Sequence, residues 1–175
     1  MLACQIDRFY LCKSVNLAYF FIVMALVWDL LISRAEEKNM NKDRLTIKSQ
    51  EAIREAVSIS TSNGQQVVQT GHLLKGVIRE GEHIVSFIFN KLGVSLNEFE
   101  LRIDEVIARY PKSSGGEPFL SSEVSRVLEE AYKKATRMGD DFVALEHILI
   151  SFPLIKDDIS RLFKEFGLSS QMMEK

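Results

Sequence analysis

Cysteine and proline are scarce in this sequence, and each absence excludes a class of structure. Both cysteines, Cys4 and Cys12, lie within the first dozen residues, so the remainder holds neither a disulfide framework nor a thiolate metal site. Three prolines and nine glycines in 175 residues favour long helices over many short strands. The reducing cytoplasm is the expected compartment.

An excess of charge of either sign is also missing. There are 22 basic and 24 acidic residues, for a formal net charge of −2. Because no basic stripe is present, binding to nucleic acid through phosphate contacts is not expected. Neither a G-x-x-x-x-G-K-[ST] phosphate loop nor a G-x-S-x-G nucleophile motif occurs. We therefore expect no catalytic residues, no bound ATP and no enzymatic activity from this chain.

What the sequence does contain is an internal duplication. HLLKGVI at 72–78 returns as HILISFP at 147–153, an offset of 75 residues. At the same offset identities and apolar matches continue: Leu45 with Leu120, Thr46 with Ser121, Ala56 with Ala131, Gly64 with Gly139, Val68 with Val143, Ile84 with Ile159, and Ile88 with Phe163. A slip of one residue then aligns 92–94 with 166–168. Self-similarity at a fixed period is the signature of a repeat.

Each copy predicts four helices. Apolar spacing, capping residues and closing glycines place the first four between Thr46 and Gly64, Thr70 and Gly81, 82 and 92, and after Ser95. The second set runs from Ser121 to Gly139, through Leu145–Leu149, from 157 to 166, and from Ser169. By analogy the last helix is about two turns short at Lys175, which suggests a fragment or a shortened gene product.

The expected fold is therefore all-α, a pseudo-two-fold duplication of a four-helix motif with about eight helices. Repeat one covers 45–109 and repeat two covers 120–175, within a domain at 40–175. The loop 110–119 between them holds two prolines and two glycines. Each repeat alone is too small for a good core, so the two are expected to bury each other's apolar faces.

Residues 1–39 differ from the rest, and three interpretations fit them. Residues 17–28 form an unbroken apolar run of twelve, which is shorter than the roughly 20 residues of a spanning helix. The run at 17–32 is thus a signal or membrane anchor, or a packed helix. Alternatively, EEKN before Met40 corresponds to purine-rich codons, as expected if an upstream start had been assigned by mistake.

Several segments resemble a known family. They are DRLTIKSQEAI at 43–53, HLL and EHIL at the two histidines, KLGV at 91–94, YPKSSGGEPFLS at 110–121 and MGDDFVALEHIL at 138–149. Together they are similar to the N-terminal domain of Clp/Hsp100 AAA+ unfoldases, most of all to the ClpB disaggregases, over about residues 40–170. This resemblance implies a double four-helix repeat.

The resemblance also implies a function. Such a domain docks exposed hydrophobic, unfolded or aggregated polypeptide segments above an AAA+ ATPase ring, and ATP binds only in the ring modules. Positions implicated in docking match Thr46, Asp140 and Glu146, with a hydrophobic groove between the repeats. Related ClpC-type domains carry a glutamate before the histidine in both repeats and use it to recognise phosphoarginine. Gly71 stands at that position in repeat one and argues against the same recognition here.

The residues themselves add two further candidates and one exclusion. Phe119 and Phe142 lie at loop-to-helix junctions, either partly exposed in a groove or buried, as aromatic residues commonly are. His72 and His147 begin helices without a surrounding ligand cluster. A paired structural role is expected for them rather than a metal site.

Two functions of different classes follow. The first is a non-catalytic substrate-docking domain of a ClpB-like chaperone, with unfolded polypeptides and an AAA+ ring as partners. The alternative is a stand-alone adaptor that docks a folded partner to a Clp machine. A membrane partner is expected only if 17–32 is a true anchor.

Overall fold

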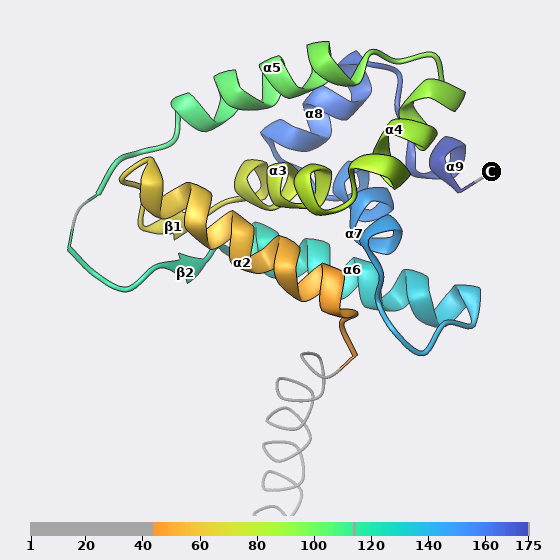
Figure 1. Ribbon diagram of the computed structural model, residues 1–175, viewed down its shortest axis with the longest axis horizontal. Coiled ribbons are helices and arrows are strands. Elements are labelled where there is room, and N and C mark those ends of the chain that lie inside the picture. Colours follow the sequence, from red (N-terminus) through yellow and green to blue (C-terminus); the bar gives the residue numbers. More distant parts are fainter. Residues whose placement is uncertain (1–43, 114, 175) are drawn as a thin grey trace, which may run out of the picture. The chain divides into compact units, whose positions relative to one another are not determined.

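The two sets of helices pack into a single unit in which each repeat contributes to the same core. The structure is a computed structural model that describes residues 44–113 and 115–174. Its elements in chain order (Figure 1) are α2 (Ile47–Ser62), β1 (Val67–Val68), α3 (Thr70–Glu80), α4 (Glu82–Lys91), α5 (Leu96–Ala108), β2 (Phe119–Leu120), α6 (Ser122–Met138), α7 (Leu145–Ser151), η1 (Phe152–Leu154), α8 (Asp158–Glu165) and α9 (Ser170–Met173). The predicted all-α double repeat is confirmed.

The expectations for residues 1–39, including a membrane segment at 17–32, lie outside the described residues. Among the residues that are described, no helix is long and apolar enough to cross a membrane.

Most helices begin at the predicted capping residue. The side chains of Thr46, Ser95, Ser121 and Ser169 each accept a hydrogen bond from the backbone N–H three residues on, which satisfies a donor that the helix leaves free. Helix α3 is the exception. It begins at Thr70, but its N-cap is Gln69.

Two short parallel bridges that the sequence did not predict join the repeats. Val68 of repeat one pairs with Leu120 of repeat two, and Leu45 pairs with Val143. The Ser121 N–H donates to the Val68 carbonyl at 2.9 Å, and the Thr46 N–H donates to the Val143 carbonyl at 3.0 Å. At the offset of 75 these are the same bond with the repeats exchanged, which is direct evidence of pseudo-two-fold symmetry. Two-residue strands are too short for an alternating pattern, and β2 begins at Phe119, inside the expected loop.

The register predicted for α4 and α8 is wrong by one residue. Gly93 and Gly167 both have positive φ, and the caps Ser95 and Ser169 follow them, so the offset here is already 74. An offset of 74 aligns the buried residues Val85 and Phe89 of α4 with the buried residues Ile159 and Phe163 of α8. Ile84 was expected inside but is 43% exposed. The shift therefore arises before α8, in the segment that joins it to α7 and contains η1.

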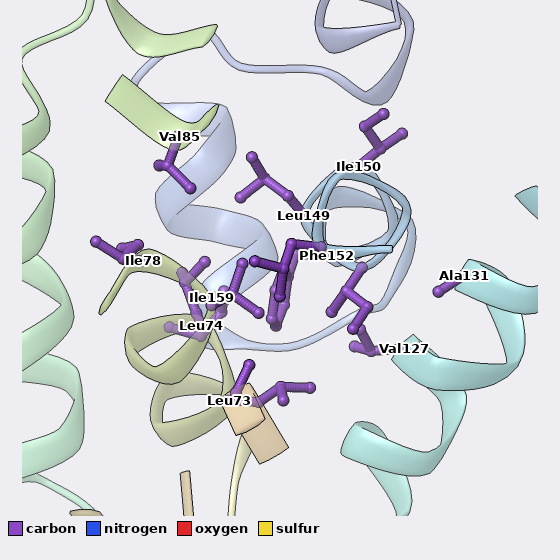
Figure 2. Packing of buried hydrophobic residues seen from close by; sticks show 14 of the residues in the cluster. Leu73, Leu74, Ile78, Val85, Val127, Ala131, Leu149, Ile150, Phe152 and Ile159 are labelled. Carbon is purple, nitrogen blue, oxygen red and sulfur yellow. The ribbon is translucent and has the colours of Figure 1, made fainter. Parts of the chain in front are cut away.

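The core is continuous across the two repeats. Leu73 and Leu74 of α3 and their equivalents Ile148 and Leu149 of α7 are completely buried. Figure 2 shows Leu74, Leu149, Phe152 and Ile159 converging from α3, α7, η1 and α8. A row of phenylalanine rings crosses the boundary between repeats, with Phe89–Phe99 centroids 4.9 Å apart, Phe99–Phe163 5.1 Å and Phe152–Phe163 6.0 Å. Neither repeat could bury these rings alone.

Helices α2 and α3 approach most closely at Gly76. A Cβ added there would lie 2.3 Å from the Ala52 carbonyl oxygen, and both Ala52 and Ala56 are completely buried. Small residues are therefore required on both sides of this crossing. The equivalent of Gly76 in repeat two is Ser151, so the close approach belongs to repeat one.

Replacement of Gly76 by alanine is expected to destabilise the protein by about 1–3 kcal/mol, because the new methyl group overlaps backbone that cannot move freely. Inside an ordinary helix the same change stabilises by about 1 kcal/mol. The sign of the change in unfolding free energy therefore shows whether α2 and α3 are in close contact at Gly76. Urea unfolding measures it, with Ser58→Ala on the exposed side of α2 as the control. A gain in stability for Gly76→Ala would contradict the close packing.

Candidate functional site

Each histidine of the duplicated motif closes the first turn of its helix. Nδ1 of His72 accepts the Gln69 N–H and Nδ1 of His147 accepts the Ala144 N–H, both at 3.0 Å. With Nδ1 as an acceptor, the neutral ring carries its proton on Nε2. Nε2 lies 2.7 Å from Gln65 Oε1 in repeat one and 3.1 Å from Asp140 Oδ2 in repeat two. Both partners stand seven residues before their histidine, and the pair has a structural role.

Both histidines are buried, but the partners of their Nε2 atoms differ in charge. His72 is completely buried and its partner Gln65 is neutral, so burial lowers the pKa of His72 to about 4. The edge of the Tyr110 ring packs on it with centroids 5.3 Å apart, and burial raises the pKa of Tyr110 to about 12. His147 instead hydrogen-bonds an exposed carboxylate, Asp140.

The Leu45–Val143 bridge brings predicted site residues together. Thr46 caps α2, its Oγ1 accepting the Ser49 N–H at 3.2 Å, while its own N–H donates to the Val143 carbonyl. Ser49 Oγ donates to the same carbonyl at 2.8 Å. The loop 139–144 is thereby held against the start of α2, although almost a hundred residues separate the two segments. Thr46, Asp140 and Glu146 thus lie at one end of the domain.

We call the residues gathered there, 45–47 and 140–146, the bridge site. It combines exposed apolar and acidic side chains. Ile47 is 74% exposed and Phe142 is 56% exposed. Asp140 and Asp141 are exposed, and Glu146 is half-buried in the first turn of α7. The Arg44 guanidinium donates to the Asp141 carbonyl at 3.0 Å, which ties the first described residue to the same loop.

Ile47 is the functional candidate that sequence reasoning missed. Its apolar side chain and its place at the start of α2 favour an inward position, yet the structure leaves it on the surface. Phe142 is partly exposed, as one of the two predicted alternatives held.

Phe119 is also exposed, at 54%, but it lies elsewhere. It pairs with Val67, which follows the C-terminus of α2. Phe142 instead precedes Val143, whose partner Leu45 lies just before the N-terminus of α2. The 16 residues of α2 span about 24 Å. The two phenylalanines therefore mark opposite ends of the domain and do not line one pocket.

Repeat one lacks an acidic counterpart of the bridge site. Gln65 occupies the position of Asp140, and Gly71 that of Glu146. The Gly71 N–H donates to the Tyr110 hydroxyl at 3.3 Å, and a Cβ at Gly71 would lie 2.9 Å from that oxygen. Tyr110 thus fills the space in which a glutamate would stand, so the positions equivalent to Asp140 and Glu146 are uncharged in repeat one.

The expected apolar groove between the repeats is not among the described clefts. A cleft of about 500 Å³ lies between α2, α3 and α5 of repeat one, with Lys112 of the inter-repeat loop at its edge. Two ion pairs cross it, Arg79 with Glu55 and Lys75 with Asp104. A second of about 430 Å³ is bounded by residues of α3, α4 and α5. Polar residues predominate in the lining of both. Exposed apolar side chains are therefore found outside these clefts, and besides those named above they include Phe87 and Leu101.

Replacement of Thr46 by alanine is expected to cost about 1 kcal/mol of stability through loss of the cap. Thr46→Ser keeps the accepting oxygen and is expected to remain within a few tenths of a kcal/mol. Chemical denaturation distinguishes them, and equal stability of the two variants would contradict the capping geometry. Binding assays with Thr46 variants must be corrected for this loss of fold.

The folded-state pKa of His72, about 4, lies below its unfolded value of about 6.5. The unfolded chain binds the proton more readily, so stability from this group is fully present above pH 6.5 and is lost as pH falls towards 4. The loss is on the order of 2–3 kcal/mol. His72→Gln, which can keep a capping-box bond at this position, should flatten the dependence between these pH values in thermal unfolding. An unchanged slope would contradict the neutral, buried state of His72.

Comparisons with known proteins agree with this architecture. A chaperone protein ClpB of Bacteroides thetaiotaomicron is 44% identical over 132 residues, which are 75% of this chain and 15% of the relative. The chain thus spans less than a sixth of that relative's length. The crystal structure of the Hsp104 N-terminal domain from Candida albicans is 20% identical, with a TM-score of 0.66, covering 74% of this chain and 86% of the other.

A third comparison concerns a peptide complex. The structure titled a complex of the ClpV N-domain with VipB peptide is 16% identical, with a TM-score of 0.62, over 76% of this chain and 84% of that one. At this identity the likeness concerns the fold. The model of the Clp repeat (R) N-terminal domain matches residues 44–166. This chain therefore belongs to the Clp repeat N-terminal domain family.

Proposed function

We propose that this domain docks exposed apolar segments of unfolded or aggregated polypeptides for a Clp-type AAA+ ATPase ring in the cytoplasm. Membership of the Clp repeat family and the chaperone name of the 44% identical relative support the class. Hydrolysis of ATP is assigned to other modules, because the phosphate-loop motif is absent from this sequence. A peptide complex of a ClpV N-domain supports peptide docking on this fold.

The bridge site carries the proposal. Ile47 and Phe142 expose large apolar side chains beside the carboxylates of Asp140, Asp141 and Glu146. Apolar side chains on an unfolded segment gain about 25 cal/mol per Å² of area buried against them. The carboxylates attract basic residues that flank such a segment and contribute mainly to the rate and specificity of association. No cavity is required, which suits ligands of many different sequences.

Docking of this kind acts through proximity. A weakly bound segment tethered above a pore is present there at a high effective concentration, so weak affinity is sufficient for transfer. Tight binding would slow the release of the segment into the ring, and the shallow, exposed site is consistent with rapid release.

The test is the fluorescence anisotropy of a labelled, permanently unfolded polypeptide titrated with the full chain. Ile47→Ser and Phe142→Ser should each weaken binding by about 5- to 10-fold, since each removes an apolar contact surface. Both side chains are largely exposed, so the fold should persist. Leu101→Ser on α5, which is 67% exposed, is the matched control and should bind as the unchanged chain does. Equal affinities for all four proteins would rule out docking at the bridge site.

The carboxylates make a separate prediction. Glu146→Gln should weaken a peptide with flanking lysines by about 2- to 5-fold at low salt, and the difference should vanish at high salt because exposed charges are screened. Glu98→Gln is the control, because Glu98 also lies in the first turn of a helix, α5, and its replacement loses a similar helix-dipole interaction. If the two variants behave alike, the acidic residues serve their helices and do not bind ligand.

A further inference from the structure

The strand β2 presents an open edge at the end of the domain opposite the bridge site. The Phe119 N–H donates to the Gln66 carbonyl at 3.1 Å and the Ser121 N–H to the Val68 carbonyl at 2.9 Å. Because successive residues of a strand direct their backbone groups to opposite sides, the N–H and C=O of Leu120 point away from β1. None of the described residues hydrogen-bonds either group. An edge of this kind is a template for another strand.

The side chains on this edge are accessible as well. Phe119 is 54% exposed and Leu120 is 38% exposed, so both residues of β2 are partly accessible. In Figure 1 β2 lies at the periphery of the domain, where the inter-repeat loop reaches it. Backbone groups and apolar side chains are therefore available together to one ligand.

The duplicate of this edge, at the other end of the domain, is closed. Leu45 is the equivalent of Leu120, and its carbonyl accepts the Gln50 amide at 3.0 Å. Its side chain is only 8% exposed. Gln50 is replaced in repeat two by Ser125, whose hydroxyl donates to the Ser121 carbonyl at 3.3 Å and leaves Leu120 free. Among the described residues, the carbonyl of Leu45 is thus paired and that of its equivalent Leu120 is not.

We infer that β2 binds an extended segment of unfolded polypeptide by strand addition, with Leu120 supplying the backbone hydrogen bonds and Phe119 an apolar contact. Two residues and two side chains offer far less than the roughly 800 Å² per partner of a stable protein interface. The edge is therefore too small for a second folded copy and suits a single strand. Backbone recognition accepts many sequences, as the proposed docking function, on which this inference rests, requires.

Leu120→Pro is the sharpest test, because proline removes the outward N–H and keeps the inward bonds of Phe119 and Ser121. Proline is tolerated on an edge strand whose N–H faces solvent, and it favours extended structure in the preceding residue. The control, Leu120→Ala, loses the side chain and keeps the N–H. The probes are a short labelled peptide of alternating valine and serine and its twin, N-methylated at every second residue.

On the unchanged full chain the N-methylated twin should bind about 3- to 10-fold more weakly than the parent peptide, the effect of losing a backbone hydrogen bond. Leu120→Pro should weaken both peptides by a similar factor relative to Leu120→Ala, because it removes the N–H that donates to a peptide carbonyl. N-methylation removes a different bond, the one from the peptide N–H to the Leu120 carbonyl. Leu120→Ala should still discriminate between the peptides. Circular dichroism and thermal unfolding check that Leu120→Pro is folded.

Equal binding of both peptides by the unchanged chain would overturn strand addition, even if Leu120→Pro proved unstable. Binding of the parent peptide by a folded Leu120→Pro variant as tightly as by Leu120→Ala would overturn the assignment to this edge. These results would leave the proposed function intact as long as the unfolded polypeptide still binds. Failure of that polypeptide and of both peptides to bind would overturn the proposed function together with this inference.

Discussion

The fold depends on the exchange of backbone hydrogen bonds between the two repeats. Thr46 reaches the Val143 carbonyl and Ser121 reaches the Val68 carbonyl, at 3.0 and 2.9 Å, so the segment preceding the first helix of each repeat is paired with the other repeat. These donors and acceptors would be costly if left unpaired in the interior. The bridges set the two repeats in register and allow the aromatic row from Phe89 to Phe152 to pass between them.

The exchange also creates the two ends at which ligands are proposed to bind. Each bridge stands at one end of α2, and each carries exposed apolar side chains: Ile47 and Phe142 at one end, Phe119 and Leu120 at the other. The duplicated sequence has diverged at both. One end has Asp140, Glu146 and a paired Leu45 carbonyl. The equivalent positions at the other end are Gln65, Gly71 and Leu120, whose carbonyl has no hydrogen-bond partner among the described residues. A symmetric scaffold thus offers side-chain contacts at one end and backbone contacts at the other.

Much of the fold could be predicted from the sequence, because helices are specified by capping residues and apolar spacing within a short stretch of chain. The capping residues Thr46, Ser95, Ser121 and Ser169 and the apolar spacing between them placed the helices to within a residue or two. The offset between the histidines revealed the duplication. The family resemblance predicted that Thr46, Asp140 and Glu146 take part in the same docking role. The one-residue error between α4 and α8 arose because a run of apolar residues satisfies either register, and only the burial of Val85 with Ile159 distinguishes them.

The amino-acid sequence by itself determined the helices, the double repeat and the family, since periodicity and caps act over a few residues. The tertiary structure alone decided that Ile47 faces solvent, that Phe119 and Phe142 lie apart, and that Tyr110 fills the space over Gly71. It also decided that, within the described part of the chain, the Leu45 carbonyl has a hydrogen-bond partner and the Leu120 carbonyl has none. These features depend on contacts between residues far apart in the chain, and pairing over such distances leaves no local pattern in the sequence.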